Sequence, residues 1–204
     1  MRWFLLAVAG IALAGCATRG VQQLPLLGDW ETRQQVLSTI DNWSLRGRVG
    51  IRTPEEASSA SLSWTQQSRE FNAELDGPLG IGGLRMQGNP RAVTLTGSRI
   101  DTVTVADPET ELLRQTGVRV PVSGLRYWLL GVPMPGVSAD VDVDEQGTAR
   151  QISQSGWTIR YTEYRRWELN ALPRKIEASY ADTRLTVIIR DWDIAQQAMS
   201  SAQR

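Results

Sequence analysis

Short runs in which apolar and polar residues alternate recur along the chain and leave few architectures open to it. The alternation is clear over residues 42–52, again at Leu62 and Trp64, and from Phe71 to Leu75. Successive side chains of a strand point to opposite faces, so each run predicts a strand with one buried and one wet face. The same pattern returns at 140–144, 157–162, 176–180 and 185–189. We therefore expect antiparallel strands, because such sheets tolerate one face in water.

Turn-forming residues separate these runs. Gln67-Ser68 follows the second run, and Gly88-Asn89-Pro90 divides residues 84–87 from 92–96. Ala181-Asp182 lies between the last two runs. Short connections of this kind join neighbouring antiparallel strands, so the strands are expected to follow one another as hairpins.

Three segments have helical spacing instead, at 29–40, 107–117 and 121–131. Asp29 is an acceptable N-cap, Asp107 precedes a proline at the first helical position, and Gly117 is a stop signal. Two short helices thus divide two groups of strands. This order predicts an α+β fold in which helices lie against the concave side of one strongly curved antiparallel sheet, without parallel crossovers.

The N-terminus has the layout of a signal peptide. Arg2 supplies positive charge, and residues 3–15 form an uncharged apolar run. This run is shorter than the roughly 20 residues that a bilayer-spanning helix needs. Leu13-Ala14-Gly15-Cys16 resembles the bacterial lipobox, which implies that Cys16 receives a lipid and that the preceding residues are removed. An ordinary secretory signal with an incidental cysteine is the alternative.

The domain boundaries follow from these segments. We predict a lipoprotein signal peptide at 1–15, a lipidated N-terminus and tether at 16–28, a single domain at 29–192 and a polar tail at 193–204. The residue after Cys16 is Ala17 and not the aspartate that resembles an inner-membrane retention signal. The lipoprotein resemblance therefore implies anchoring to the outer membrane on its periplasmic face.

Composition excludes several classes of function. The chain has no histidine and one cysteine, which removes imidazole bases, histidine-ligated metals and thiolate clusters. Its 22 basic and 22 acidic residues balance, whereas nucleic-acid binders carry excess positive charge. Paired carboxylates at Glu55-Glu56 and at Glu109 with Glu111 leave a glycosidase open in principle, but acidic residues in loops and at helix starts are usually structural. We expect a protein that is not an enzyme.

A series of motifs resembles the LolB family of outer-membrane lipoproteins. They are WSLRG at 43–47, LSW at 62–64, GPLG at 77–80, PVSGLRYWLLGVP at 121–133, QSGWTIRY at 154–161 and IRDW at 189–192. None is diagnostic alone, yet their order and spacing cover nearly the whole mature chain. The resemblance implies an open, incomplete antiparallel β-barrel with a short-helix lid over an apolar cavity, similar in fold to the periplasmic carrier LolA.

The resemblance also implies a function. The protein would accept lipoproteins from a LolA-like carrier, bind their acyl chains and insert them into the outer membrane. Its partners would be that carrier, lipoprotein substrates and outer-membrane lipids, with no nucleic acid; the protein would be a monomer without a cofactor other than the lipid on Cys16. A lipid-sensing or scaffold lipoprotein of similar fold is the alternative.

Three kinds of site residue follow. The large apolar side chains of one sheet face and of the lid are candidates for the acyl-chain cavity: Trp64, Leu84, Met86, Leu113, Leu125, Trp128 and Leu129. The resemblance makes Arg46 a latch that bonds lid backbone from inside the barrel. The alternative is a strand residue that points to solvent, because alternation places Arg46 on the same face as Arg48. Leu79, between Pro78 and Gly80, is expected to be the exposed apolar tip of a loop, and the resemblance implies that this tip inserts into the membrane.

Overall fold

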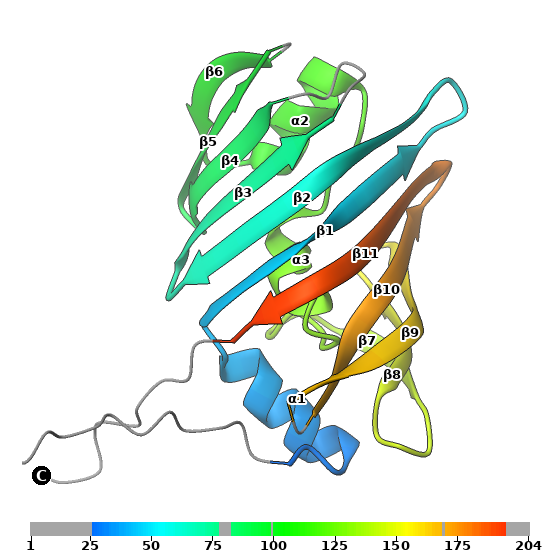
Figure 1. Cartoon of the computed structure of the whole chain (residues 1–204). Helices are drawn as coiled ribbons and strands as arrows, with labels where there is room; N and C mark the ends of the chain where they lie inside the picture. The colour runs from blue at the N-terminus through cyan, green and yellow to red at the C-terminus, as the bar shows by residue number, and fades with distance from the viewer. Residues whose placement is uncertain (1–25, 78–82, 99, 169, 195–204) are drawn as a thin grey trace, which may run out of the picture.

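The computed structural model describes residues 26–77, 83–98, 100–168 and 170–194 (Figure 1). Within these residues the chain forms three helices and one antiparallel sheet of eleven strands. The helices are α1 (Trp30–Thr39), α2 (Pro108–Thr116) and α3 (Val122–Trp128). The strands are β1 (Asn42–Arg52), β2 (Ala57–Gln67), β3 (Glu70–Asp76), β4 (Leu84–Asn89), β5 (Ala92–Gly97), β6 (Ile100–Val105), β7 (Ala139–Val143), β8 (Ala149–Gln154), β9 (Trp157–Trp167), β10 (Asn170–Tyr180) and β11 (Thr183–Asp193).

The sheet consists of two meanders, β1–β6 and β7–β11, which are joined where β1 pairs with β11. Its order is β6-β5-β4-β3-β2-β1-β11-β10-β9-β8-β7, so the first and last strands of the chain are neighbours in the middle. β6 and β7 remain unjoined edges, and the sheet is an incomplete barrel. The predicted α+β fold with a curved, open antiparallel sheet is confirmed.

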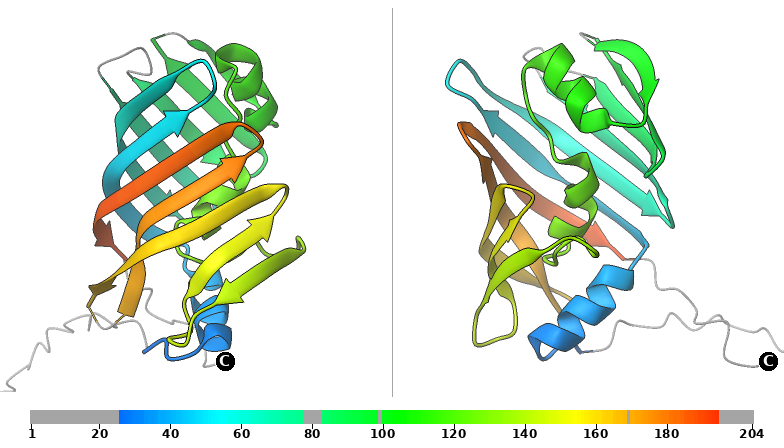
Figure 2. Two further views of the ribbon diagram at one scale, coloured as in Figure 1. Left: turned by 90° about the vertical axis from the view of Figure 1, so that its right-hand side faces the viewer. Right: turned by 180° about the vertical axis from the view of Figure 1, so that it is seen from behind.

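The sheet curves around the helices, and its concave face is the buried one (Figure 2). In β1 residues 43, 45, 47 and 49 are buried while Arg46 and Arg48 are exposed. α3 lies on the concave side of the sheet, α2 packs near β5 and β6, and α1 lies across one end (Figure 2). The alternation in the sequence therefore separates a helix-covered face from an exposed convex face.

The helix ends follow the signals in the sequence. The Asp29 carboxylate accepts a hydrogen bond from the Thr32 amide at 2.8 Å, and Asp107 caps α2 in the same way through Thr110 at 3.0 Å. Gly117 ends α2 with a φ of 72°, a left-handed conformation that glycine adopts without strain. The predicted helices are confirmed.

Two strands are absent from the sequence prediction. β6 contains only two alternating valines after its start, and β8 has a single large apolar side chain, Ile152. In β6 the two valines are out of register with Ile100 at its start, and in β8 no second large apolar side chain alternates with Ile152, so neither sequence shows sustained alternation.

A bulge in β11 shapes the middle of the sheet. Arg46 pairs with Asp191 and Gly47 with Ile189, so Arg190 is an extra residue. The extra residue turns Trp192 to the same face as Ile189, where its ring packs edge-on against Trp43 at 5.5 Å. The strands approach closely here, because a Cβ on Gly47 would lie 2.3 Å from the Ile188 carbonyl oxygen.

Candidate functional site: the cavity beneath helix α3

A small cavity lies between α3 and the C-terminal strands. Three of its lining side chains come from α3 and the residue after it, and the others come from the concave face of β9, β10 and β11. They are Leu125, Trp128, Leu129, Ile159, Ile176, Ala178, Leu185 and Val187. All eight are apolar, so the cavity favours an apolar ligand and penalises a polar or charged one.

The cavity is closed in this structure. Its volume is about 10 Å³, which is close to the minimum that holds one water molecule. Trp128 and Leu129 are each 2 % exposed, and they fill the space between α3 and the strands. An acyl chain therefore enters only if α3 moves away from the sheet.

We call residues 122–137 the lid segment: α3 together with the loop that follows it. One buried side chain at the end of β8, Gln154, makes four hydrogen bonds to this segment. Its Oε1 accepts from the Trp128 indole Nε1 at 2.9 Å and from the Met134 amide at 2.8 Å. Its Nε2 donates to the Met134 and Val137 carbonyl oxygens at 2.9 and 3.0 Å.

A tyrosine adds a second connection between lid and sheet. The Tyr161 hydroxyl of β9 donates to the Trp128 carbonyl oxygen at 2.9 Å. Burial raises the pKa of Tyr161 well above its ordinary value, so this hydroxyl stays protonated and acts as a donor. The Trp128 ring also packs against Trp157, with ring centroids 6.3 Å apart.

Gly124 makes room for the Trp128 ring within α3 itself. A Cβ at Gly124 would lie 2.6 Å from Trp128 Cζ2, which is inside van der Waals contact. The indole therefore lies over the glycine on the preceding turn, where its N–H reaches Gln154.

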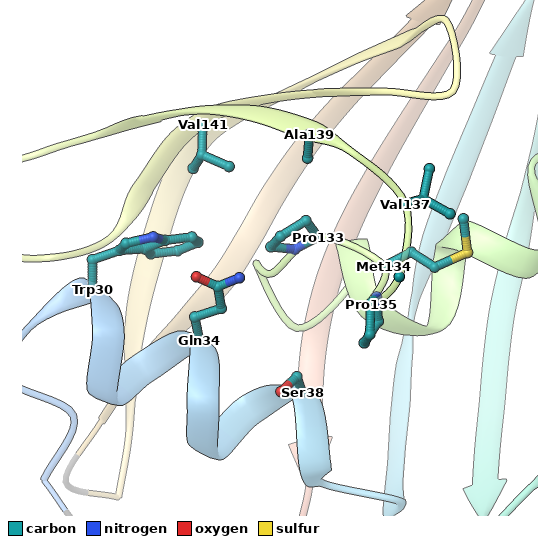
Figure 3. A pocket seen from close by; sticks show the side chains of 10 residues that line it. Trp30, Gln34, Ser38, Pro133, Met134, Pro135, Val137, Ala139 and Val141 are labelled. Atoms are coloured by element: carbon teal, nitrogen blue, oxygen red, sulfur yellow. The ribbon is translucent and has the colours of Figure 1, made fainter.

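A second depression lies between α1 on one side and the loop of the lid segment and β7 on the other (Figure 3). Its volume is about 400 Å³, and no charged side chain lines it. Trp30, Gln34 and Ser38 form the α1 wall. The opposite wall runs from Pro133 to Val141, and Val137 in it is 43 % exposed. This groove is not predictable from the sequence, because its two walls are about a hundred residues apart in the chain.

Comparison with known proteins decides the family. The model of the family described as outer membrane lipoprotein LolB matches residues 41–192, which includes every strand of the sheet except the last residue of β11. The chain belongs to the LolB family.

Individual LolB relatives match over nearly their whole length. The outer-membrane lipoprotein LolB of Cellvibrio japonicus is 39 % identical, with 93 % of this chain and 94 % of the relative covered. That of Chromohalobacter salexigens is 36 % identical, covering 94 % and 90 %. The resemblance noted in the sequence motifs is confirmed.

Solved structures agree with this fold at low sequence identity. A LolA superfamily protein from Nitrosomonas europaea has a TM-score of 0.52 at 8 % identity and covers 83 % of this chain and 95 % of its own. A DUF1329 family protein from Desulfovibrio piger has a TM-score of 0.54 at 5 % identity, covering 79 % and 89 %. These likenesses concern the fold alone.

The structure separates the predicted cavity residues of this LolB family member into two groups. Leu125, Trp128 and Leu129 line one cavity together. The remaining four do not line it: Trp64, Leu84 and Met86 are buried on the concave face of β2 and β4, and Leu113 is half-buried on α2. Their part in acyl-chain binding stays a prediction.

Aromatic packing explains the place of Trp64. Its ring lies 6.0 Å from Trp43 and 5.1 Å from Phe71, both nearly parallel, and Trp43 in turn contacts Trp192. These four rings pack together on the concave face where β1 begins. Trp64 is thus part of a packed aromatic cluster about the central strands, away from the cavity beneath α3.

The prediction that Arg46 lies inside the barrel and latches the lid is wrong in this structure. Arg46 is exposed and lies on the same face of β1 as Arg48, while its neighbours Leu45 and Gly47 are buried. Period two along an unbroken strand forces this outcome, because the bulge beside Arg46 lies in β11 and leaves the alternation of β1 intact.

Some of the predicted site residues lie outside the part of the chain that the structure describes. Cys16, Pro78, Leu79 and Gly80 are outside the described ranges. In the part of the chain that is described, no cluster of three metal-ligating side chains occurs, and no helix has the length and hydropathy to cross a membrane.

Gln154 is the residue of this site that sequence reasoning missed. It lies two positions after Ile152, on the buried face of a strand. A polar residue at an inward position of a strand is the signal that would have identified it.

Proposed function

We propose that the protein is an outer-membrane-anchored acceptor of lipoproteins, which takes them from a LolA-like periplasmic carrier and inserts them into the outer membrane. Their acyl chains bind in the cavity beneath α3 once the lid segment has moved. The observation that carries this proposal is the all-apolar lining of that cavity. Membership of the LolB family supports the location and the transport role.

Physical chemistry accounts for acceptance without catalysis. Transfer of a lipidated protein between two apolar sites breaks no covalent bond, so no nucleophile, metal or nucleotide is needed. Each methylene kept from water contributes about 0.8 kcal/mol, so a chain that passes directly from carrier to acceptor avoids a large hydration penalty. A difference in affinity between the two cavities then suffices for direction.

The closed cavity gives this mechanism an obligatory step. Because the cavity holds about 10 Å³, the acyl chains must replace contacts between α3 and the strands. The side chains of α3 that now fill the cavity would then pack on the bound chain. The apolar surface remains covered in both states, which keeps the hydrophobic part of the cost of opening small.

Transfer tests the proposal. The domain without residues 1–16 is mixed with a LolA-like carrier that is loaded with a lipoprotein, and the two are separated by affinity tags. We expect the lipoprotein to be recovered with the domain and no longer with the carrier. Binding of a fatty acid without transfer from the carrier would instead favour the lipid-sensing or scaffold alternative.

Leu125→Asp tests the site. A carboxylate in this apolar lining should reduce acceptance at least tenfold, since an unpaired charge facing an apolar ligand site is strongly penalised. Ser138→Asp is the matched control, because it adds the same charge at an exposed position just beyond the lid segment. Equal acceptance by both variants would remove the cavity from the mechanism.

A further inference from the structure

Gln154 has an unusual position for a neutral polar side chain. It is 3 % exposed and faces the concave side, where its neighbours on the sheet are apolar. A side-chain amide has two donor hydrogens and one acceptor oxygen with two lone pairs, and here all four are used. All four partners belong to the lid segment.

We propose that Gln154 is the positioning residue that holds the lid segment closed, so that affinity for acyl chains depends on how readily its four hydrogen bonds separate. This inference rests on the proposed function. It assigns to a neutral side chain at the end of β8 the holding role that the exposed Arg46 does not have.

The partners of Gln154 explain why one residue controls the whole segment. Trp128 is at the C-terminal end of α3, and Met134 and Val137 are in the loop beyond it. The amide therefore connects both parts of the lid segment to the same strand. If either part moved alone, the amide would lose some of its partners while Gln154 itself stayed buried, so the helix and the loop should move together.

Such a connection makes the lid a two-state element. While the lid segment is closed, the bond between Gln154 and the Trp128 indole is buried, and the three bonds to the loop are partly buried. Water has little access to the Trp128 bond, so partial opening that breaks it is penalised. Once the segment has moved far enough for water to enter, the amide and its partners are hydrated. The fraction of molecules in the open state then reduces the apparent affinity for an acyl chain, which improves when the closed state is weakened.

The chain contains a matched control for this chemistry. Gln66 in β2 is 1 % exposed, and its Oε1 accepts from the Trp64 indole at 3.4 Å. Its Nε2 donates to the Ser68 and Glu70 carbonyl oxygens, both at 3.0 Å. Both glutamines accept from an indole and donate to two carbonyl oxygens, while Gln154 accepts in addition from the Met134 amide. The partners of Gln66 lie within β2, β3 and the turn between them.

The experiment compares Gln154→Met with Gln66→Met, since methionine keeps the size of the side chain and removes its hydrogen bonds. The dissociation constant for dansyl-labelled undecanoic acid is measured by fluorescence. We expect Gln154→Met to bind this fatty acid about fivefold to tenfold more tightly than the parent, because fewer molecules are closed. Gln66→Met should bind like the parent, although both variants lose buried hydrogen bonds and some stability.

Amide hydrogen exchange of the intact protein, followed in the proteolytic peptide that covers residues 122–137, gives a readout that needs no ligand. Gln154→Met should exchange faster there, while its strands keep the protection of the parent. Tyr161→Phe removes one lid bond with little risk to folding, because the Trp128 carbonyl keeps its bond from the Gly131 amide at 3.1 Å. It should change both measurements in the same direction by a smaller factor.

The outcomes separate the two proposals. Unchanged or weaker binding by Gln154→Met and Tyr161→Phe, or an equal gain in Gln66→Met, overturns the role of Gln154. If no version binds the fatty acid, the proposed function fails, and hydrogen exchange alone still decides whether Gln154 holds the lid segment.

Discussion

At the scale of single residues, Gly124 decides how Trp128 is placed. Alanine usually stabilises the interior of a helix by about 1 kcal/mol relative to glycine. In α3 the added methyl group would lie 2.6 Å from the Trp128 ring, so the indole would have to leave Gly124 and its bond to Gln154. Alanine at position 124 should therefore destabilise the protein, whereas alanine in place of glycine usually stabilises a helix.

We predict that Gly124→Ala lowers the free energy of unfolding by about 1–3 kcal/mol, the usual range for overpacking. Urea denaturation measures it. Ser123→Ala is the control, since Ser123 is exposed on the same helix and its alanine variant gains helix propensity without a clash. A more stable Gly124→Ala would mean that the indole does not lie over Gly124 in solution.

Residue identity alone could identify some of this site. Leu125, Trp128 and Leu129 are large and apolar within one short helical pattern, so a common apolar environment was predictable. Arg46 was placed inside the barrel by resemblance, against its own alternation with Leu45. The role of Gln154 was not predictable, because its hydrogen-bond partners are spread over residues 128–137. Such partners leave no periodic pattern in the sequence.

At the scale of elements, α1 fixes where the chain enters the domain. Leu27 is buried, and its amide donates to Asn170 at 2.8 Å, so firm packing begins within the predicted tether. The Arg33 guanidinium is buried and donates to the Ala171 carbonyl oxygen at 2.7 Å. Burial lowers the pKa of Arg33, which still remains a cation. These contacts hold α1 against the start of β10.

The connection between β3 and β4 is the element for which we predict a role at the membrane. Leu79 is flanked by residues that turn the chain and add little packing, and burial of one leucine in a bilayer contributes about 1.5–3 kcal/mol. That is enough to orient the domain and weak enough for release. Leu79→Glu should therefore accept lipoproteins from the carrier almost normally and deliver them poorly to liposomes.

A two-stage assay checks the Leu79 prediction, with loaded carrier first and liposomes second. Pro90→Glu, in the exposed turn between β4 and β5, is the charge control. Normal delivery by Leu79→Glu, or failure already at acceptance, would show that this connection is only a turn.

At the scale of the whole molecule, local signals predicted the hairpins, and only the assembled chain shows how they join. The β1–β11 pair brings together residues such as Val49 and Val187. Alternation identifies the buried face of each strand, but it contains no information on which distant strand lies beside it. The cavity depends on this pairing, because its lining combines α3 with β9, β10 and β11.

The position of the tether limits how an anchored molecule meets its membrane. The described chain begins at one end of the sheet, whereas the end of β3 and the start of β4 lie at the other (Figure 1). Leu26 follows Cys16 by ten residue steps, which reach about 33–36 Å when fully extended. β1, with 11 residues, is itself about 36 Å long. If Cys16 is lipidated and Leu79 enters the same membrane, the tether has little length to spare.

We therefore predict that removal of residues 19–22 impairs delivery by the anchored protein several-fold, since it shortens the reach by about 13 Å. Replacement of the same four residues by Gly-Ser-Gly-Ser should preserve delivery, because it keeps the length. Intact-mass spectrometry first establishes that each version begins at a lipid-modified Cys16. When either change is made in the domain without residues 1–16, acceptance of lipoproteins from the carrier should stay the same, because that domain lacks the anchor. Equal delivery by the shortened and full-length tethers would mean that the β3–β4 connection and the lipid anchor need not reach one membrane together.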